Sequence, residues 1–295
     1  MIRKLRSVGL KTKDLGHPEY VIGIHVQKKR KDGSIVLNKK LYIETILRRF
    51  EMQDTHGVPT PADPNVKLSK KLEAQTQTDD EKAKMANRPY RALVGALLYV
   101  LLTRSDCAVA VNELARYLNN PGPSMWTAAK RVLRYLKATI DHCILLKSFA
   151  RGRINGKTVA FVDSSHAGDK DTRRSRCGHL IYYNRSPINW KTILQKRVAL
   201  STAETEFRAV TLASKDILWL RNLLHEIDRS PCKPTLIYED NSACIKMVEN
   251  PVVSGKNKFV ELNIHFVRDH DHWSRPKTNL HERLSERYPH ARSTG

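Results

Sequence analysis

The sequence predicts an α/β fold with a mixed β-sheet, preceded by a mainly helical segment. Two changes of pattern along the 295 residues support this prediction. From Pro89 onward, apolar residues recur at helical spacing as far as a stop signal at residues 119–123. After Gly156 the chain changes to short apolar runs that are typical of strands, interrupted by one long helix. This alternation indicates a sheet covered by helices.

The N-terminal third predicts a small β unit and a linker. Residues 20–26 and 35–37 are typical of strands, and the Asp32-Gly33 pair between them is a hairpin signal. A helix over residues 41–50 follows. Residues 57–88 are rich in Pro, Asp, Lys, Gln and Thr and show little periodicity, which favours a loop or linker.

The last helix before Gly156 is predicted to begin at a Ser124 cap and to carry a basic face. Its apolar stripe consists of Trp126, Ala129, Val132, Leu133 and Leu136. The other face consists of Lys130, Arg131, Arg134 and Lys137. This basic face either contacts the phosphate groups of a nucleic acid or is simply solvated.

The second half predicts three strands, a long helix, a fourth strand and further helices. The strands span residues 158–163, 178–183, 188–191 and 235–239, with the long helix at 202–227 before the fourth strand. Further helices are predicted from Asp240-Asn241 onward and over residues 260–267.

The chain is strongly basic, with 52 Lys+Arg, 30 Asp+Glu and a formal net charge of +22. Residues 1–156 contain 29 Lys+Arg and 14 Asp+Glu, so most of the excess lies in the first half. An excess on one domain is typical of a nucleic-acid-binding surface, since neutralised phosphates release counterions. The alternatives are a solvated basic surface or a nuclear import signal at residues 28–31.

Membrane and secreted proteins are not favoured. No run approaches the roughly 18 apolar residues of a membrane span, and the first residues contain no apolar signal core. The five cysteines are scattered without a Cys-x-x-Cys pair, which argues against a disulfide framework and a zinc knuckle. We therefore expect a reducing, intracellular location, cytoplasmic or nuclear, and no membrane partner.

Three carboxylates at the ends of predicted elements form the candidate catalytic and metal-binding site. Asp163 ends the first strand of the second half, Asp240 directly follows the fourth, and Glu206 lies in the first turns of the long helix. If these two strands are parallel neighbours, both aspartates leave the same carboxyl edge of the sheet, where α/β folds bind ligands. Clustered carboxylates favour a hard cation, and Mg²⁺ fits them better than Zn²⁺. Two such ions about 3.5–4 Å apart would support phosphodiester hydrolysis.

Each of these carboxylates also has a purely structural interpretation. An aspartate after a strand often caps the next helix, which would suit Asp240. A glutamate near a helix start complements the helix dipole, which would account for Glu204 or Glu206. The spacing of these residues is compatible with both the structural and the metal-binding interpretations.

Several ordered motifs resemble copia-type retrotransposon Pol polyproteins. Four stretches are similar to the ribonuclease H domain of these elements, namely residues 161–169 (FVDSSHAGD), 186–190 (SPINW), 199–207 (ALSTAETEF) and 238–241 (YEDN). Residues 89–99 (PYRALVGALLY) and 128–137 (AAKRVLRYLK) look like the C-terminal part of the same elements' reverse transcriptase. Residues 14–16 with 20–24 resemble the segment that follows the polymerase active site.

The resemblance implies a ribonuclease H-like mixed sheet with helices, behind a mainly helical remnant of a reverse transcriptase. The implied parts are the end of the palm at 1–56, a linker at 57–88, a thumb- or connection-like helical part at 89–150, a C-terminally incomplete ribonuclease H-like domain at 157–268, and an unrelated polar tail at 269–295.

The activity implied by the resemblance is hydrolysis of the RNA strand of an RNA–DNA hybrid with two magnesium or manganese ions. By motif position, Asp163, Glu206 and Asp240 match three of the family's catalytic, metal-binding carboxylates. Recognition would rest on phosphates, 2′-hydroxyl groups and groove shape, with the basic face of the last helix before Gly156 as a candidate track. Other segments of the Pol polyprotein are expected partners.

The sequence also departs from the family pattern. Its Tyr-x-Asp-Asp signature is not found, so no DNA polymerisation is expected. The resemblance fades after Arg268, before the strand and the helix that carry a fourth metal-binding aspartate in the family. Asp269 and Asp271 are candidate substitutes, although a solvated tail without an apolar strand is the preferred interpretation. Ser165 and His166 replace the family's usual Asp-Trp pair.

Two functions follow as hypotheses. The first is a retrotransposon-derived ribonuclease H whose second ion site is weakened by the missing aspartate. The alternative is a non-catalytic, nucleic-acid-binding remnant of a Pol polyprotein. A fragment that does not fold stably alone would instead show a broad, non-cooperative melt.

Overall fold

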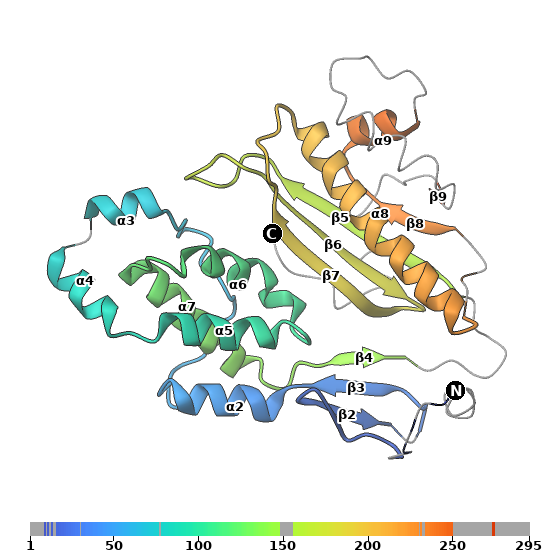
Figure 1. Ribbon diagram of the computed structural model, residues 1–295, viewed down its shortest axis with the longest axis horizontal. Coiled ribbons are helices and arrows are strands. Elements are labelled where there is room, and N and C mark those ends of the chain that lie inside the picture. The colour runs from blue at the N-terminus through green and yellow to red at the C-terminus, as the bar shows by residue number, and fades with distance from the viewer. Residues whose placement is uncertain are drawn as a thin grey trace.

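The computed structural model describes residues 9, 11, 13, 16–29, 31–76, 78–147, 156–229, 231, 234–249 and 273–274. Two lobes follow each other along the chain (Figure 1). The first lobe, residues 16–147, combines a small sheet with a group of helices. The second lobe, residues 156–249, is a larger sheet crossed by one long helix, as the sequence predicted.

The sheet of the first lobe is antiparallel, with the strand order β1-β2-β3-β4. Its strands are β1 (Tyr20–Val21), β2 (Ile24–Lys28), β3 (Ile35–Asn38) and β4 (Ile144–Leu146). The prediction of a single strand over residues 20–26 is wrong. Ile22 and Gly23 have φ values of 48° and 62°, and Val21 pairs with Ile24, so the chain reverses in a two-residue turn. This turn is hard to recognise in the sequence because Asn, not Ile, usually precedes Gly in such turns.

The helices of the first lobe enclose one apolar core. They are α2 (Lys40–Arg49), α5 (Tyr90–Val100), α6 (Ala108–Leu114) and α7 (Pro123–Ala138), with short 3₁₀ turns at Ser105–Cys107 and Ala115–Tyr117. The apolar stripe of α7 is buried as predicted, with Val132 and Leu133 fully enclosed. The predicted Ser124 cap is wrong, because Gly122 is the N-cap and Pro123 the first helical residue. The fixed φ of proline and its missing N–H suit that position.

Residues 57–88 contain two helices, so the prediction that they lack regular structure is wrong. The helices are α3 (Lys70–Thr76) and α4 (Asp79–Ala86). At the start of α4, the Glu81 N–H donates to the Thr78 hydroxyl at 3.3 Å and the Thr78 N–H donates to the Glu81 carboxylate at 3.0 Å. This capping box supports a helix with little apolar periodicity, in which Met85 is the buried residue.

The second lobe contains a mixed sheet with the strand order β7-β6-β5-β8-β9. Its longer strands are β5 (Thr158–Ser165), β6 (Arg176–Tyr183), β7 (Ser186–Leu194) and β8 (Thr235–Tyr238). The first three are antiparallel, whereas β5 and β8 are parallel, with Phe161 opposite Tyr238. The prediction that the first and fourth strands are parallel neighbours is therefore confirmed.

Two helices cover this sheet (Figure 1). Helix α8 (Thr202–Glu226) crosses β5 and β6, and α9 (Ser242–Glu249) packs against α8. Phe207, Val210 and Ala213 of α8 belong to the same core as Ala160 of β5 and Ile181 of β6. The long helix thus holds its first turns close to the end of β5.

A two-residue strand, β9 (Trp273–Ser274), pairs in parallel with β8. The sequence predicts a solvated polar tail without an apolar strand over residues 269–295, and this short pairing occurs within it, because the unpaired backbone groups of an edge strand pair regardless of side-chain polarity. Asp269, Asp271 and the predicted helix at 260–267 lie outside the described residues.

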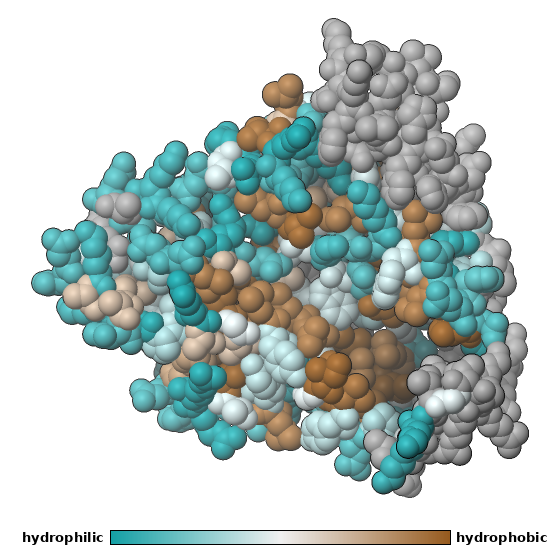
Figure 2. All heavy atoms as spheres, viewed as in Figure 1, coloured by the Kyte–Doolittle hydropathy of each residue, from teal (hydrophilic) through white to brown (hydrophobic). Residues whose placement is uncertain are grey.

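The lobes contact each other through β7. The Lys147 N–H, at the end of β4, donates to the Ser186 hydroxyl at 2.9 Å. The Trp190 indole N–H donates to the Leu101 carbonyl at 3.0 Å. Figure 2 shows apolar side chains gathered in the middle of this face, with polar ones around them. Among the described residues, no helix has the length and apolar character needed to cross a membrane.

Candidate metal centre

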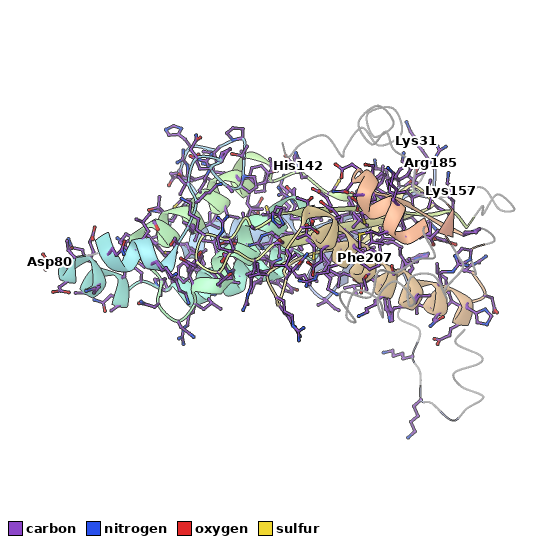
Figure 3. All side chains as sticks on the ribbon, turned by 90° about the horizontal axis from the view of Figure 1, so that it is seen from above. Lys31, Asp80, His142, Lys157, Arg185 and Phe207 are labelled. Atoms are coloured by element: carbon purple, nitrogen blue, oxygen red, sulfur yellow. The ribbon has the colours of Figure 1, made fainter. Side chains whose placement is uncertain are left out.

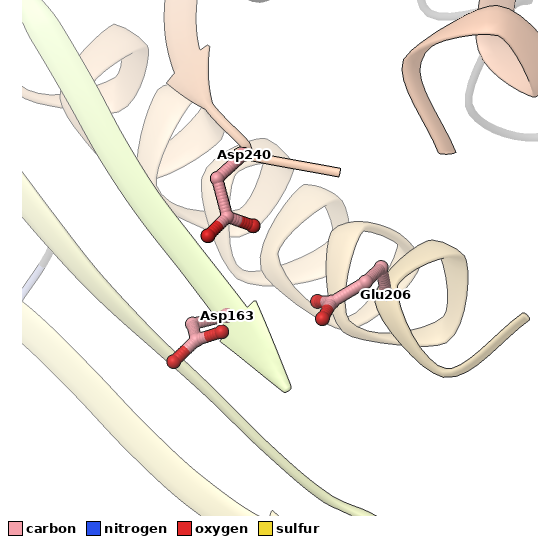
Figure 4. A group of neighbouring side chains, drawn as sticks. All are labelled: Asp163, Glu206 and Asp240. Atoms are coloured by element: carbon pink, nitrogen blue, oxygen red, sulfur yellow. The ribbon is translucent and has the colours of Figure 1, made fainter. Parts of the chain in front are cut away.

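The three predicted carboxylates meet at the carboxyl edge of β5 and β8 (Figure 4). Asp163 comes from the end region of β5, Asp240 from the residues just after β8, and Glu206 from the first turns of α8. One oxygen atom of each carboxylate lies within 4.8 Å of the other two. The structure therefore brings together all three carboxylates of the predicted catalytic site.

The parallel pairing of β5 and β8 creates this proximity. The rings of Phe161 and Tyr238 stack with centroids 5.1 Å apart and an interplanar angle of 10°, which holds the two strands in register. Asp163 and Asp240 each stand two residues beyond this pair, so they lie side by side at the carboxyl edge of the two strands. Asp163 and Asp240 are exposed, whereas Glu206 is only 7% exposed and forms the buried side of the site.

Two neighbouring glutamates of α8 have different roles. Glu204 accepts hydrogen bonds from the Leu200 N–H at 2.9 Å and from the Arg208 guanidinium at 2.5 Å, at the start of the helix. The structural interpretation therefore accounts for Glu204. Glu206 instead faces Asp163 and Asp240, and its Oε2 atom is buried without a hydrogen-bond partner among the described residues.

The structural alternative for Asp240 is helix capping, and another residue fills that role. The Asn241 side-chain oxygen accepts the Cys244 N–H at 3.0 Å and so caps the start of α9. The carboxylate of Asp240 is left to join the three-carboxylate group.

The cluster is electrostatically costly without a cation. Burial raises the pKa of Glu206 to about 7, and the charges of Asp163 and Asp240 add to this rise. The nearby Ser164 hydroxyl opposes it, although that hydroxyl is not in hydrogen-bonding geometry. Although Asp163 is exposed to solvent, partial desolvation by its neighbours raises its pKa, and the charge of Asp240 adds to this rise. A hard divalent cation would offset this repulsion and satisfy the orphaned Glu206 oxygen, so the donor set fits a Mg²⁺- or Mn²⁺-like ion.

Sequence reasoning missed a fourth carboxylate beside the cluster. Glu239 is 1% exposed, and burial raises its pKa to about 8, while the Asn241 N–H opposes the shift. That N–H donates to Glu239 Oε1 at 3.0 Å, whereas Oε2 has no partner among the described residues. The available signal was the pair of successive acidic residues at the end of the fourth strand.

The predicted basic track on α7 is largely engaged within the first lobe. The Arg131 guanidinium donates to the Thr60 hydroxyl at 2.9 Å, the Arg134 Nε to the His56 carbonyl at 2.8 Å, and the Lys137 Nζ to the Thr55 carbonyl at 2.6 Å. Lys130 lines a cavity of about 660 Å³ that extends from α7 to the β5–β6 loop. Three of these four side chains hold the loop before α3, and nucleic-acid binding by this face stays a prediction.

Sequence comparison finds relatives among plant transposon proteins. The chain is 34% identical over 273 residues to the retrovirus-related Pol polyprotein from transposon TNT 1-94 of Nicotiana tabacum, which covers 91% of this chain and 20% of that protein. It is 32% identical over 207 residues to the uncharacterized mitochondrial protein AtMg00810 of Arabidopsis thaliana, which covers 70% of this chain and 80% of that one. The chain thus spans about a fifth of the Pol polyprotein, and no protein-family model matches it.

Structure comparison finds distant similarity to known nucleic-acid enzymes of two kinds. One is the N-terminal RNase H domain of rv2228c from Mycobacterium tuberculosis, with a TM-score of 0.33, 9% identity and coverage of 44% of this chain and 86% of that one. Another is the foamy viral protease-reverse transcriptase in complex with an RNA/DNA hybrid, with a TM-score of 0.39, 11% identity and coverage of 67% and 26%.

The family assignment rests on sequence identity, which extends over nine-tenths of the chain and through both lobes. The chain belongs to the retrovirus-related Pol polyproteins of copia-type transposons, in which it represents the part that runs from the end of the reverse transcriptase into the ribonuclease H domain.

Proposed function

We propose that this chain is a retrotransposon-derived ribonuclease H that hydrolyses the RNA strand of RNA–DNA hybrids at the edge formed by β5 and β8. The observation that supports this proposal is the convergence of Asp163, Glu206 and Asp240 within 4.8 Å. The family membership of the chain supports the choice of reaction and substrate.

Each carboxylate has a defined part in this proposal. Asp163, Glu206 and Asp240 would hold divalent magnesium or manganese, which when bound supplies the activation of water and the stabilisation of the leaving oxygen. Because the three side chains stand on two strand ends and a long helix, their positions are set by rigid elements. Asp163 and Asp240 are exposed, so the edge is open to a polymer, whereas Glu206 is buried behind them.

The test is cleavage of an end-labelled RNA–DNA hybrid in magnesium buffer. Asp163→Asn keeps the size of the side chain and removes its charge. We expect it to lower the cleavage rate about 100-fold or more, the effect of losing several kcal/mol of transition-state stabilisation. Equal cleavage by wild type and Asp163→Asn, or none by either, contradicts the proposal.

The matched control is Asp228→Asn. Asp228 is also exposed and lies just beyond the other end of α8. With a helical rise of about 1.5 Å per residue, it is about 33 Å from Glu206. The cleavage rate of this variant should equal that of the wild type.

A non-catalytic nucleic-acid-binding remnant is the second candidate function, and the net charge of +22 supports it. It predicts hybrid binding that weakens steeply with salt, together with no cleavage by any variant. Binding that does not depend on salt argues against this candidate.

A further inference from the structure

We infer that the end of the molecule opposite the metal centre is a second surface that binds the backbone of a nucleic acid. This basic end consists of six exposed side chains, Lys28, Lys29, Lys31, Lys147, Lys157 and Arg185. Its Lys28, Lys29 and Lys31 belong to the basic run near the start of the chain, which the proposed function leaves without a role. The inference goes beyond the proposed function, because binding here requires neither a metal nor cleavage.

Both lobes contribute to the basic end. Lys28 pairs with Ile35, and Ile35 pairs with Leu146, so the β2–β3 turn lies beside Lys147. The Lys147 N–H donates a hydrogen bond to the hydroxyl of Ser186, the residue that follows Arg185 in the sequence. Backbone and side-chain hydrogen bonds of 2.9 and 3.1 Å then join Asn184 to Lys157.

The view from above agrees with this grouping for the three members that it labels. Figure 3 shows Lys31, Arg185 and Lys157 at the same end of the molecule. Lys157 directly precedes β5, whereas Asp163 is six residues further along that strand. At about 3.3 Å per residue, the basic end and the metal centre are about 20 Å apart.

The positive charge of the basic end is barely compensated. Among the described residues 28–29, 31–34, 147, 156–157 and 184–186, Asp32 is the one carboxylate. It accepts hydrogen bonds from the Ser34 N–H and hydroxyl at 3.0 and 2.8 Å. Lys28, Lys29, Lys31, Lys147 and Arg185 form no ion pair with a described residue. A polyanion would therefore meet several available cations.

Arg185 occupies a position at which its own backbone is strained. It follows Asn184 in the two-residue β6–β7 hairpin, and their φ values are 64° and 48°. Glycine is the residue that such a turn prefers at the second position, because it lacks a Cβ. The chain thus carries a cation at the turn where glycine would be the relaxed choice.

The size and polarity of the basic end favour a nucleic acid over an anionic membrane. Strands β2, β3 and β4 of one sheet and β7, β6 and β5 of the other meet this end, and each group spans about 10 Å at about 4.8 Å per strand. The two groups together span about 20 Å or more, a length that about six phosphates of one strand cover at 3.4 Å each. In the described residues that carry or directly flank the six cations, namely 28–29, 31–34, 147, 157 and 184–185, there is no exposed large apolar side chain, whereas Ile188 and Ile193 are exposed further along β7. Membrane-surface elements usually combine cations and apolar anchors in the same segment.

The experiment measures binding of a labelled RNA–DNA hybrid and of a DNA duplex, each about 20 base pairs long, or about 68 Å at 3.4 Å per pair. EDTA is present, so that cleavage does not contribute. The full chain is compared with the double variant Lys31→Gln/Arg185→Gly. We expect the plot of log affinity against log salt to become shallower by about 1.8, about 0.9 for each lost phosphate contact.

The matched control is Lys71→Gln/Lys84→Gln, which removes two exposed charges from α3 and α4. Its salt dependence should equal that of the wild type. An equal change in both double variants shows an effect of net charge alone and overturns the inference. An unchanged slope for Lys31→Gln/Arg185→Gly also overturns it. Binding to phosphatidylserine vesicles is measured in parallel, and a loss of binding in this variant that is confined to the vesicles overturns the inference as well.

A stability measurement separates binding from folding. Arg185→Gly relieves the left-handed backbone, so we expect it to raise Tm by about 2–4 °C while weakening binding. Weaker binding with a lowered Tm and a disturbed fold contradicts the role given to Arg185. A result in EDTA does not depend on catalysis, so failure of the proposed function leaves this test intact.

Discussion

Asp171 of the second lobe caps helix α3 of the first lobe through Ser69. Asp171 Oδ1 accepts the Ser69 hydroxyl at 2.5 Å, and Oδ2 accepts the Lys70 N–H at 2.8 Å. In the same β5–β6 loop, Asp169 forms an ion pair with Arg116 of the first lobe. This loop directly follows the strand of Asp163, so contacts between the lobes hold the backbone next to the candidate metal centre.

We predict that Asp171→Ala lowers the free energy of unfolding by about 1–2 kcal/mol, because the first N–H groups of α3 lose their cap. Chemical denaturation measures the change. The control is Asp141→Ala, which breaks a surface ion pair with Lys40 in which the aspartate is 78% exposed. That pair should contribute less than about 1 kcal/mol. Equal losses in the two variants would show that the contact between the lobes adds no stability.

Glu206→Gln should stabilise the metal-free chain and abolish cleavage. It removes a buried charge from a group of three carboxylates, so we expect a gain of about 0.5–2 kcal/mol in EDTA at a pH above the Glu206 pKa of about 7. Thermal melts and the hybrid assay measure the two effects.

Glu204→Gln is the matched control for Glu206→Gln. It is the same chemical change two residues away, and it breaks the ion pair with Arg208, whose guanidinium contacts Glu204 at 2.5 Å. We expect destabilisation in this case, because both groups are mostly buried. If Glu206→Gln also destabilises the chain in EDTA, the three carboxylates do not repel one another appreciably.

His179 is predicted to make the second lobe sensitive to acid. Burial lowers its pKa and the charge of Lys191 adds to this, while Asn189 and Asp216 oppose it. Its Nε2 lies 3.1 Å from both Asn189 Oδ1 and Asp216 Oδ2, whereas its buried Nδ1 has no partner among the described residues. The neutral ring is therefore the folded form.

The sign of the effect follows from this lowered pKa. Below pH 6.5, the ordinary pKa of histidine, the unfolded chain takes up a proton at this residue and the folded chain resists it. The free energy of unfolding therefore decreases as the pH is lowered. We expect His179→Gln to reduce the drop in Tm between about pH 7 and pH 5. The control His142→Gln changes an exposed residue and should keep the wild-type dependence. Identical profiles for all three proteins would rule out this role for His179.

Ile22→Asn should stabilise the first lobe by about 1 kcal/mol, because Asn tolerates the left-handed backbone that costs a β-branched residue about that much. Ile22 has a φ of 48° and is 75% exposed, so little apolar contact is lost. Its carbonyl still accepts the Tyr99 hydroxyl, at 2.5 Å. Thermal denaturation measures the gain, and Ile22→Val, which keeps the branched side chain, should show none.

Local features of the sequence were sufficient for much of the second lobe. Strands β5 to β8 and helix α8 follow from alternating apolar runs and one long helical period. The three carboxylates of the candidate site could be selected because each stands at the end of such an element. The resemblance to Pol polyproteins also lies in contiguous motifs, which sequence alone displays.

Local features failed where structure depends on few or distant residues. Helix α4 depends on a capping box rather than on periodicity, and the turn at Ile22-Gly23 contains an unusual residue for its backbone. Helix α3 is capped by Asp171, about 100 positions away in the chain. No pattern within residues 57–88 contains that information.

The sequence by itself determined which elements form, which family the chain resembles and which carboxylates are candidates, because these depend on neighbouring residues. Only the tertiary structure showed that Glu206, the predicted residue, lies close to Asp163 and Asp240 while Glu204 pairs with Arg208, and that Glu239 lies buried beside them. It also decided that Arg131, Arg134 and Lys137 of α7 contact the chain's own loop, whereas Lys31, Lys157 and Arg185 gather at one end. Strand pairing and helix packing set these distances between residues far apart in the chain, and distance governs electrostatic interaction.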